Sequence, residues 1–344
     1  MLYKDCPAHK AGVYVGDTII RVNGEDMAAQ PLDHISSLLK GMPSTQVQLT
    51  VVRQGVEQPI TLTLTREKVN LKNVPYFGKV QDEIGYIRLA NFATHAADEV
   101  QAALKSLQER GAQKLILDLR GNPGGILEEA IKVVNLFIDE GLTVVATKGK
   151  IASWAKTYTT TQSAYDSHLP VIVLIDQKSA SAAEIVAGVI QDYDRGLLMG
   201  KSTFGKGLVQ STRSLSYNTQ LKLTTARYYL PSGRSIQKID YRQQKGTEQT
   251  VQEEQEVRSV FTTQAGRIVY EQEGVAPDIG GEKWRWAPIT ISLIEKGLVF
   301  EYATHFQAQN SHIAPASKFA LSDAQYQDFV TWLQDKDYPY TIEQ

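Results

Sequence analysis

Short apolar runs alternate with helical patterns through the middle of this 344-residue chain. The runs that indicate strands are 85–89, 114–120, 143–147, 170–176 and 196–200, and the patterns that indicate helices are 97–110, 127–138 and 181–193. Alternation of this kind requires right-handed crossovers, which cover the faces of a largely parallel sheet with helices. Ligands of such folds bind at the carboxyl ends of the strands. The sequence therefore predicts an α/β core, with Gly121–Gly125 and Lys178–Ser181 at strand ends where a site forms.

A smaller β-rich segment precedes this core. Thr18–Val22 is typical of a strand, and the Asn23-Gly24 pair that follows it is a strong hairpin signal. Apolar residues at helical spacing predict a helix over 31–39. Residues 46–53 and 59–66 alternate apolar and polar side chains, which predicts two paired strands.

Two further segments lie beyond the core pattern. Residues 240–256 are polar and rich in Gln and Glu, so they are predicted to form an exposed insertion or a solvated helix. Residues 291–344 are predicted to be mostly helical, with Ser322-Asp-Ala-Gln as the capped start of one helix.

The composition argues against several classes of function. Lys and Arg total 36 against 38 Asp and Glu, so the net charge of −2 gives no reason to expect a nucleic acid or an anionic membrane as the partner. Cys6 is the single cysteine and the six histidines are scattered, so neither a metal nor another cofactor is expected. No apolar stretch approaches the roughly 18 residues that span a bilayer, and no signal segment opens the chain.

Ser181 lies where the strand at 170–176 gives way to a helix. Ser181-Ala-Ala-Glu184 matches a capping box, and most serines at this spacing only cap a helix. A helix N-terminus also presents free N–H groups and a positive potential. A serine nucleophile at this position has an oxyanion donor beside it, the N–H of Ala182. On these residues alone, both interpretations stay open.

Lys206 stands between Gly205 and Gly207, so its backbone is unusually free. A lysine acts as a general base only when its pKa falls from about 10.4 towards neutrality, which burial can achieve. Phe204 and Leu208 are candidates for the apolar wall that such burial needs. The alternative is an ordinary exposed lysine in a loop.

Gln210 is a candidate for holding the Lys206 amine in place by a hydrogen bond. Residues four apart in a straight strand lie about 13 Å from each other. Contact between the two side chains therefore requires a bend, which the glycines beside Lys206 permit.

The turn Gly121-Asn-Pro-Gly-Gly125 follows a buried strand and leads into a helix. Its glycines leave backbone N–H groups unobstructed, which suits a second oxyanion donor. A plain strand-to-helix turn explains the same residues equally well.

Together these motifs resemble those of a known family. LDLRGNPGG, SASAAEIVAG with the following Gln191-Asp192, TFGKGLVQ and the later ARYYLPSGR are similar, in this order, to motifs of the C-terminal processing peptidases, also called tail-specific proteases. The resemblance covers residues 6–280, and Lys206 and Gln210 follow Ser181 by the family's spacing of 25 and 29 residues. AHKAGVYVGDTIIRVNG and the elements after it resemble a PDZ domain, which the family carries in this position.

The resemblance implies a catalytic role for three side chains. Ser181 is the expected nucleophile, Lys206 the expected general base, and Gln210 the residue expected to orient Lys206. The expected oxyanion hole consists of the backbone N–H groups of Ala182 and of Gly125 or Gly124.

The resemblance also implies a fold and a function. The core is expected to be similar to the α/β spiral of crotonases and Clp proteases, and no cofactor is implied. The chain is expected to be a serine endopeptidase that cleaves proteins at or near their C-terminal tails. Its expected partners are protein or peptide substrates with apolar C-terminal tails, which the PDZ domain recognises. Bacterial members act in the cell envelope, periplasmic or membrane-anchored, and we expect that location here.

The expected domain order is a partial PDZ domain at 1–68, a Ser-Lys protease core at 69–299 and a helical extension at 300–344. A PDZ domain normally starts with an earlier strand and a glycine-containing loop that binds the peptide carboxylate. We expect the natural protein to supply both before Met1. The helical extension lies outside the resemblance and is a candidate for contacts within a homo-oligomer.

Two alternatives belong to other classes of function. A catalytically silent scaffold would present peptides through its PDZ domain, but a silent relative is expected to lose Ser181 or Lys206, and this chain has both. A Ser-His-Asp hydrolase would use His95, but no serine lies in a G-x-S-x-G elbow and His95 stands in a polar stretch. If Ser181 is not the nucleophile, Ser179 is the first candidate.

Overall fold

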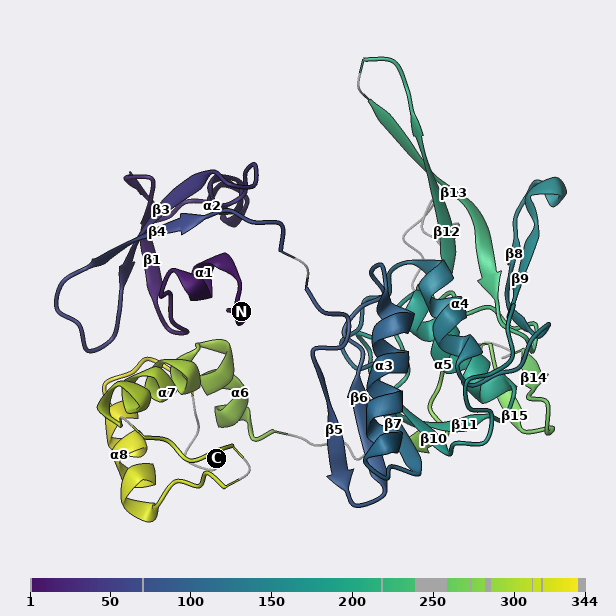
Figure 1. Ribbon diagram of the computed structural model, residues 1–344. Coiled ribbons are helices and arrows are strands. Elements are labelled where there is room, and N and C mark those ends of the chain that lie inside the picture. Colours follow the sequence, from purple (N-terminus) through teal and green to yellow (C-terminus); the bar gives the residue numbers. More distant parts are fainter. Residues whose placement is uncertain are drawn as a thin grey trace, which may run out of the picture. The chain divides into compact units, whose positions relative to one another are not determined.

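The computed structural model describes residues 2–69, 71–217, 219–238, 259–271, 274–281, 286–310, 312–316 and 318–339 (Figure 1). The chain forms two compact units. The larger unit runs from Leu71 to Lys283, and the smaller unit combines Met1–Asn70 with Trp284–Gln344. Within the part of the chain that is described, no helix is long and apolar enough to cross a membrane.

A six-stranded sheet with the order β16-β11-β10-β7-β6-β5 forms the centre of the larger unit. Its strands are β5 (Tyr76–Gln81), β6 (Ile84–Arg88), β7 (Lys114–Asp118), β10 (Val171–Ile175), β11 (Gly196–Gly200) and β16 (Ile279–Gly280). β5 is antiparallel to β6, and the other neighbours are parallel. β10 pairs with a strand on each edge, which suits its continuous apolar sequence VIVLI.

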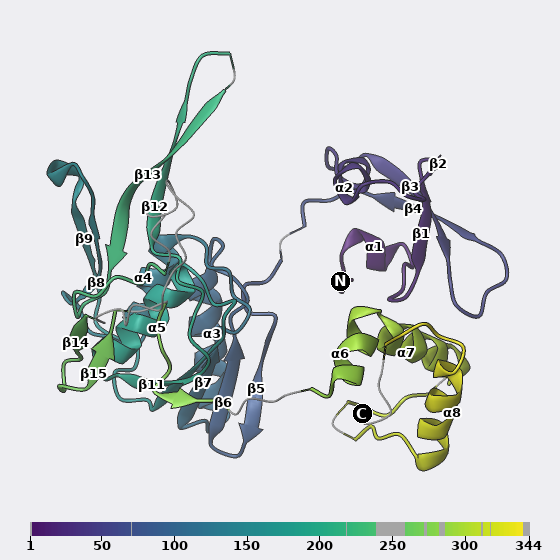
Figure 2. The same ribbon diagram turned by 180° about the vertical axis from the view of Figure 1, so that it is seen from behind.

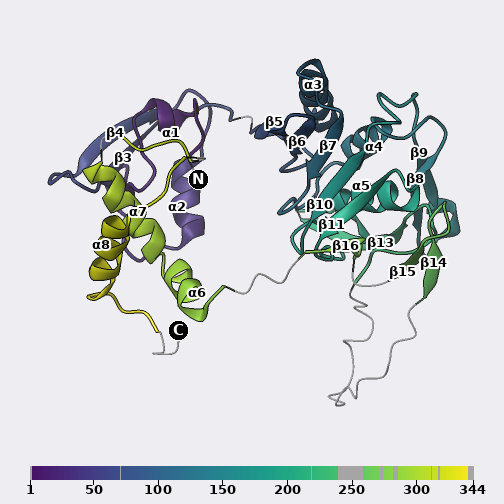
Figure 3. The same cartoon turned by 90° about the horizontal axis from the view of Figure 1, so that it is seen from below.

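Three helices of this unit are α3 (Ala96–Glu109), α4 (Leu127–Asn135) and α5 (Ala182–Asp192). α4 contacts both α3 and α5, so the three form one layer (Figure 3). α3 buries Val100, Leu104 and Leu107, the stripe that the helical spacing predicts. α5 is buried along its whole length, and this burial fixes the position of the residue that precedes it.

A second sheet of the larger unit is antiparallel and has the order β12-β13-β8-β9. Its strands are β8 (Thr143–Lys148), β9 (Lys156–Thr159), β12 (Leu208–Ser214) and β13 (Gln220–Tyr229), and a 3₁₀ turn, Ala152–Trp154, lies between β8 and β9. β12 and β13 form a long hairpin that projects from the unit (Figure 2). A short antiparallel pair, β14 (Val260–Thr262) and β15 (Ile268–Tyr270), belongs to the same unit.

The N-terminal part of the smaller unit is a sheet with the order β2-β1-β3-β4 and two helices. The elements are α1 (Pro7–Lys10), β1 (Thr18–Val22), β2 (Glu25–Asp26), α2 (Leu32–Leu39), β3 (Gln46–Val52) and β4 (Ile60–Thr65). β1 and β2 pair across Asn23 and Gly24, whose φ values are 50° and 84°. The predicted hairpin is therefore confirmed.

The C-terminal part of the smaller unit is helical. It contains α6 (Pro288–Glu295), α7 (Leu298–Gln309) and α8 (Asp323–Leu333). Ser322 caps α8, because its side chain accepts a hydrogen bond from the Gln325 N–H. The predicted helical segment and its capped start are both confirmed.

The predicted fold class is confirmed, since an α/β core follows a PDZ-like β-segment and precedes a group of helices. The compact core ends at Lys283, whereas the prediction placed 284–299 inside it. The physical reason is that Leu293 and Leu298 pack with Leu333 among the C-terminal helices. The insertion predicted at 240–256 lies outside the described residues.

Candidate active site

Ser181 occupies the N-cap of α5, after the loop that follows β10. Its backbone has φ 57° and ψ −116°, a conformation that L-residues rarely adopt. Strain of this kind costs about 1–3 kcal/mol and persists only where the surroundings impose it. A serine on a strained strand-to-helix turn is also the arrangement that presents the nucleophile of many hydrolases.

Ser179, the other candidate nucleophile, is fully buried. Its Oγ donates to the carbonyl of Leu119 at 2.8 Å and accepts from the N–H of Asp176 at 3.0 Å. Because its hydroxyl is engaged inside the protein and out of reach of a substrate, the structure favours Ser181.

Gly124 packs directly against the Ser181 loop. A methyl group added at its Cα would lie 2.6 Å from the Ala180 carbonyl oxygen and 2.8 Å from the Ser181 Cβ. The Gly124 φ of 96° also favours glycine. This position therefore tolerates only glycine if Ser181 is to keep its place.

The two glycines considered for the oxyanion hole differ in their hydrogen bonds. The Gly124 N–H donates to Oδ1 of Asn122 at 2.8 Å, so it is already engaged. The N–H groups of Gly125 and Ala182 have no acceptor among the described residues, and Gly125 is exposed. The geometry therefore favours Gly125 over Gly124 as the partner of Ala182.

Two residues tie the glycine turn to the loop that carries the serine. The carbonyl of Asn122 accepts from the Ala180 N–H at 2.9 Å. Oδ1 of Asp176 accepts from the N–H groups of Gly121, at 2.9 Å, and Ser179, at 3.0 Å. These bonds hold the two candidate halves of an oxyanion hole in one arrangement.

Asp118, at the end of β7, anchors the start of the same turn. Its carboxylate is buried and accepts from Nε and Nη2 of Arg120, at 2.9 and 2.7 Å, and from the Tyr86 hydroxyl at 2.6 Å. Burial acts to raise the pKa of Asp118, but the hydrogen bonds from Arg120 and Tyr86 outweigh it and hold the pKa below its usual 3.8.

Glu184 joins the serine to the lysine loop. Its Oε2 accepts from the N–H of Ser181 at 2.7 Å and from the N–H of Lys206 at 2.9 Å. Its Oε1 accepts from the Thr203 hydroxyl at 2.6 Å and from the Gly205 N–H at 2.7 Å. The side chain is fully buried, and this burial raises the pKa of its carboxyl although the four donors oppose the change.

Lys206 lies in the wall of an open cleft, and its side chain is exposed. The expected apolar cover is missing in this structure, because the neighbouring Phe204 is 54% exposed. Ser181 is not among the described residues that line the cleft. The structure thus brings together the backbones of the serine and the lysine, and it leaves the lysine amine in the open cleft.

Gln210 lines the same cleft as Lys206. Between the two residues, the β12–β13 register shifts at Val209 and Gln210, so this segment is not a regular straight strand. Such a shift re-aims the side chains that follow it.

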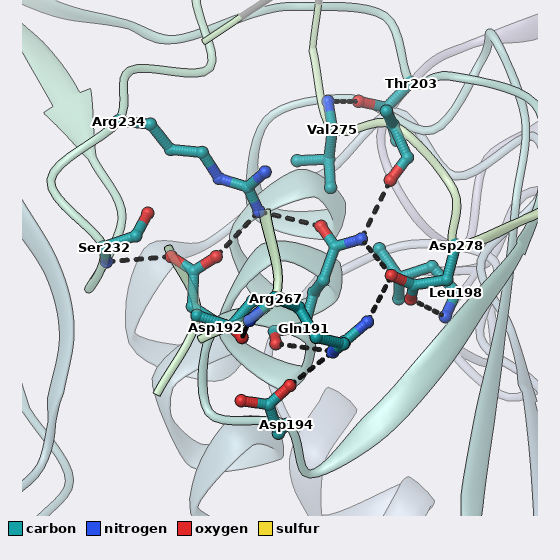
Figure 4. A network of polar contacts seen from close by, with 12 residues as sticks. Gln191, Asp192, Asp194, Leu198, Thr203, Ser232, Arg234, Arg267, Val275 and Asp278 are labelled. Carbon is teal, nitrogen blue, oxygen red and sulfur yellow. Dashed lines mark hydrogen bonds and ion pairs between the residues drawn. The ribbon is translucent and has the colours of Figure 1, made fainter. Parts of the chain in front are cut away.

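The far end of α5 is fixed by a network of polar contacts (Figure 4). Arg234 donates through Nη2 to Oε1 of Gln191 and to Oδ1 of Asp192, both at 2.8 Å. Gln191 in turn donates to Oδ1 of Asp278 at 2.8 Å, and Arg267 binds the same carboxylate. Arg234 and Asp192 are buried, so the helix that begins at Ser181 is held at both ends.

Sequence reasoning missed the role of Glu184 and gave none to Asn122, Asp176 or Thr203. The capping box drew attention to Glu184 but explained only its bond to Ser181. The available signal was a glutamate in an otherwise apolar helix: if this helix is buried, the Glu184 carboxylate needs further hydrogen-bond donors.

His95 takes no part in the site as the structure describes it. It lies at the start of α3, its ring pairs with Asp98 at 2.8 Å, and its side chain is 74% exposed. It does not line the cleft that contains Lys206. The arrangement therefore gives no support to a Ser-His-Asp triad.

Three family models match the chain. Residues 83–253 match peptidase family S41, residues 2–53 match a PDZ domain, and residues 289–344 match a probable PDZ-protease C-terminal helical domain. The S41 match contains every residue of the candidate site.

Among known proteins, the chain is similar to processing proteases. It is 40% identical to a carboxy-terminal-processing protease of Bartonella bacilliformis and 37% identical to a carboxyl-terminal-processing protease of Synechocystis, over 68% of this chain in each case. It spans only about half of these relatives, 54% and 55% of their lengths.

One solved structure that is similar to this chain is a photosystem II D1 C-terminal processing protease. It is 29% identical, the alignment covers 80% of this chain and 65% of that one, and the TM-score is 0.48. The family match over the whole candidate site and the identity to processing proteases agree with each other. The chain therefore belongs to peptidase family S41.

Proposed function

We propose that this chain is a serine endopeptidase with a Ser-Lys dyad. Ser181 is the nucleophile, Lys206 the general base, and Gln210 the residue that orients the Lys206 amine. The N–H groups of Ala182 and Gly125 form the oxyanion hole.

One observation carries this proposal. Ser181 is held in a strained conformation beside two N–H groups that have no acceptor among the described residues, and its backbone shares the Glu184 carboxylate with Lys206. A purely structural helix cap needs neither the unused donors nor the strain.

The proposed reaction assigns one step to each of these groups, and it requires the Lys206 amine to reach Ser181 Oγ from the cleft. Lys206 Nζ takes the proton from Ser181 Oγ as the oxygen attacks the scissile carbonyl carbon. The negative charge that forms on the carbonyl oxygen is stabilised by the N–H groups of Ala182 and Gly125. Lys206 then returns the proton to the leaving amine, and water hydrolyses the acyl-enzyme with Lys206 again as the base.

The proposed substrates are proteins cleaved at or near their C-terminal tails, with apolar terminal residues that the PDZ domain recognises. The names of the two relatives support cleavage near C-terminal tails, and the PDZ match at residues 2–53 supports a role of that domain in recognition. The preference for apolar terminal residues is proposed by resemblance to the family. The proposed location is the bacterial cell envelope, by resemblance to the family.

Cleavage of an unstructured protein with an apolar C-terminus, measured for the wild type and the variants, tests the proposed dyad. Ser181→Ala and Lys206→Ala are expected to lower kcat/KM by about 10³-fold or more, and Gln210→Ala by about 10²-fold. Mass spectrometry of the fragments locates the cut relative to the tail.

Matched controls keep the test specific. Ser163→Ala removes an exposed serine that does not line the cleft, and Lys105→Ala removes an exposed lysine from α3; both are expected to cleave like the wild type. Cleavage that survives in Ser181→Ala would place the nucleophile elsewhere. An inactive wild type that still binds the tail peptide would favour the silent scaffold instead.

A further inference from the structure

The cleft beside Lys206 is larger than a site for a small molecule. Its volume is about 2180 Å³, whereas small-molecule pockets usually measure about 300–1,000 Å³. It lies between the loop after β11, the start of β12, the strand β13 and the end of β8. A cleft of this size and openness suits an extended peptide segment.

The charged side chains that the structure describes in the lining of this cleft all have the same sign. Its described lining residues include the cations Lys148, Lys150, Lys201, Lys206, Arg227 and Lys238. No Asp or Glu occurs among the lining residues that the structure describes. The whole chain has a net charge of −2, so positive charge is concentrated here.

The cations converge from segments far apart in the sequence. Lys148 and Arg227 are directly opposite each other in the β8–β13 pair. Gly149, next to Lys148, leaves no room for a side chain, because an added methyl group would lie 2.1 Å from the Thr225 carbonyl oxygen. The β8–β13 pair therefore places two cationic side chains next to each other in the wall of the cleft.

Two of these lysines have no carboxylate to neutralise them. Neither Lys150 nor Lys201 forms an ion pair or a hydrogen bond through its amine with any described residue, and both are exposed. Several other exposed lysines do form such pairs, for example Lys132 with Glu129 and Lys296 with Asp337. These two lysines of the cleft are therefore available to a ligand.

From this convergence we infer that the cleft binds acidic side chains of the substrate, so that the peptidase prefers sequences with Asp or Glu close to the cut. This inference rests on the proposed function and adds a substrate class to it. A single terminal carboxylate would neutralise one cation, whereas Lys150 and Lys201, whose amines have no partner among the described residues, match two or more acidic side chains. Charge-assisted hydrogen bonds from the amines of Lys150 and Lys201 to the substrate carboxylates would supply the recognition.

Binding tests the inference without cleavage. Ser181→Ala is titrated with a fluorescein-labelled peptide that spans a cut site and carries Glu residues, and with the same peptide carrying Gln. Each peptide is prepared with a free and an amidated C-terminus. The Glu peptide is expected to bind about tenfold or more tighter than the Gln peptide at low salt, and the difference is expected to shrink at high salt.

Variants of the lysines identify the source of the preference. In the Ser181→Ala background, Lys150→Gln with Lys201→Gln is expected to bring the Glu-to-Gln ratio of Kd values close to one. Lys105→Gln, on the exposed face of α3, is expected to leave the ratio unchanged. All three lysines are exposed, so loss of folding does not explain a difference between the double variant and Lys105→Gln.

The outcomes separate this inference from the proposed chemistry. Equal binding of the Glu and Gln peptides would overturn it, and so would a preference that disappears on amidation, because the terminal carboxylate would then be the ligand. If the wild type cleaves neither peptide but the Glu preference and its loss in the lysine variant are measured, the hydrolytic proposal fails and the acidic preference stands.

Discussion

The backbone N–H groups of Ser181 and Lys206 donate to one atom, Oε2 of Glu184, at 2.7 and 2.9 Å. The two nitrogens therefore lie no farther apart than the sum of these distances. The lysine loop is bound to the same carboxylate again through Gly205. Glu184 thus fixes where the base enters the site, although it has no part in the proposed proton transfer.

Replacement of Glu184 by Gln tests this role. The four contacts of the carboxylate are all donors, so a Gln amide group turned to either side leaves at least one backbone N–H facing its NH₂ group. We expect the dyad to lose its alignment and kcat to fall by about 10²-fold, with a smaller change in KM. Steady-state kinetics on a peptide substrate measure both constants.

The control is Glu128→Gln, which changes an exposed carboxylate on α4. Circular dichroism and thermal unfolding show whether the Glu184 variant is folded. A folded Glu184→Gln enzyme with the kcat of the wild type would mean that the shared carboxylate does not set the position of Lys206.

Gly124→Ala is expected to lower the activity through a steric clash with the loop that carries Ser181. The added methyl group would lie 2.6 Å from the Ala180 carbonyl oxygen and 2.8 Å from the Ser181 Cβ, so the serine loop has to move. We expect kcat/KM to fall by about 10²-fold or more, because small displacements of a nucleophile cost that much.

Gly121→Ala is the matched control for this variant. Both glycines have positive φ values, 96° at Gly124 and 73° at Gly121, so both substitutions add backbone strain. An added methyl group at Gly121 meets no atom within 4 Å. If the two variants lose the same activity, strain of the turn and not contact with Ser181 is the cause.

The local parts of this site could be predicted from the sequence. The strand-turn-helix pattern placed Ser181 at the start of α5 and the glycine turn at the end of β7, because periodicity and turn residues act over a few positions. The α/β fold class followed from the same alternation.

The remaining parts depend on contacts between distant segments. Glu184 meets Thr203 and Lys206 about 20 positions further along, and no local pattern reports such a pair. The choice of Gly125 over Gly124 depends on where the Asn122 side chain points. The exposure of Lys206 depends on which side chains cover it, and this too is set by tertiary packing. β5 was not predicted, since it is a strand only through its pairing with β6.

Arg234→Met is expected to destabilise the larger unit. It leaves Asp192 buried without its cation, and loss of one partner of a buried pair costs about 3–5 kcal/mol. Calorimetry can follow the unfolding transition of the larger unit. The double variant Arg234→Met with Asp192→Asn is expected to recover part of the lost stability, because no buried charge is then left unpaired. Arg213→Met, at an exposed position of β12, is expected to unfold like the wild type.

The smaller unit is expected to lose stability in acid through Asp17. Arg53 donates to both of its carboxylate oxygens at 2.7 Å, and these bonds hold the pKa of Asp17 below its usual 3.8. The folded state then binds fewer protons than the unfolded state, so the pair stabilises the fold above about pH 4 and this contribution disappears as the pH falls through the lowered pKa. Calorimetry between pH 7 and pH 2 measures the unfolding temperature, which is expected to decline at about pH 4 and below.

Asp17→Asn is expected to unfold at a lower temperature at neutral pH and to show a smaller decline, whereas Asp33→Asn, at an exposed position of α2, is expected to follow the wild type. Parallel declines in the wild type and in Asp17→Asn would assign the acid sensitivity to other groups.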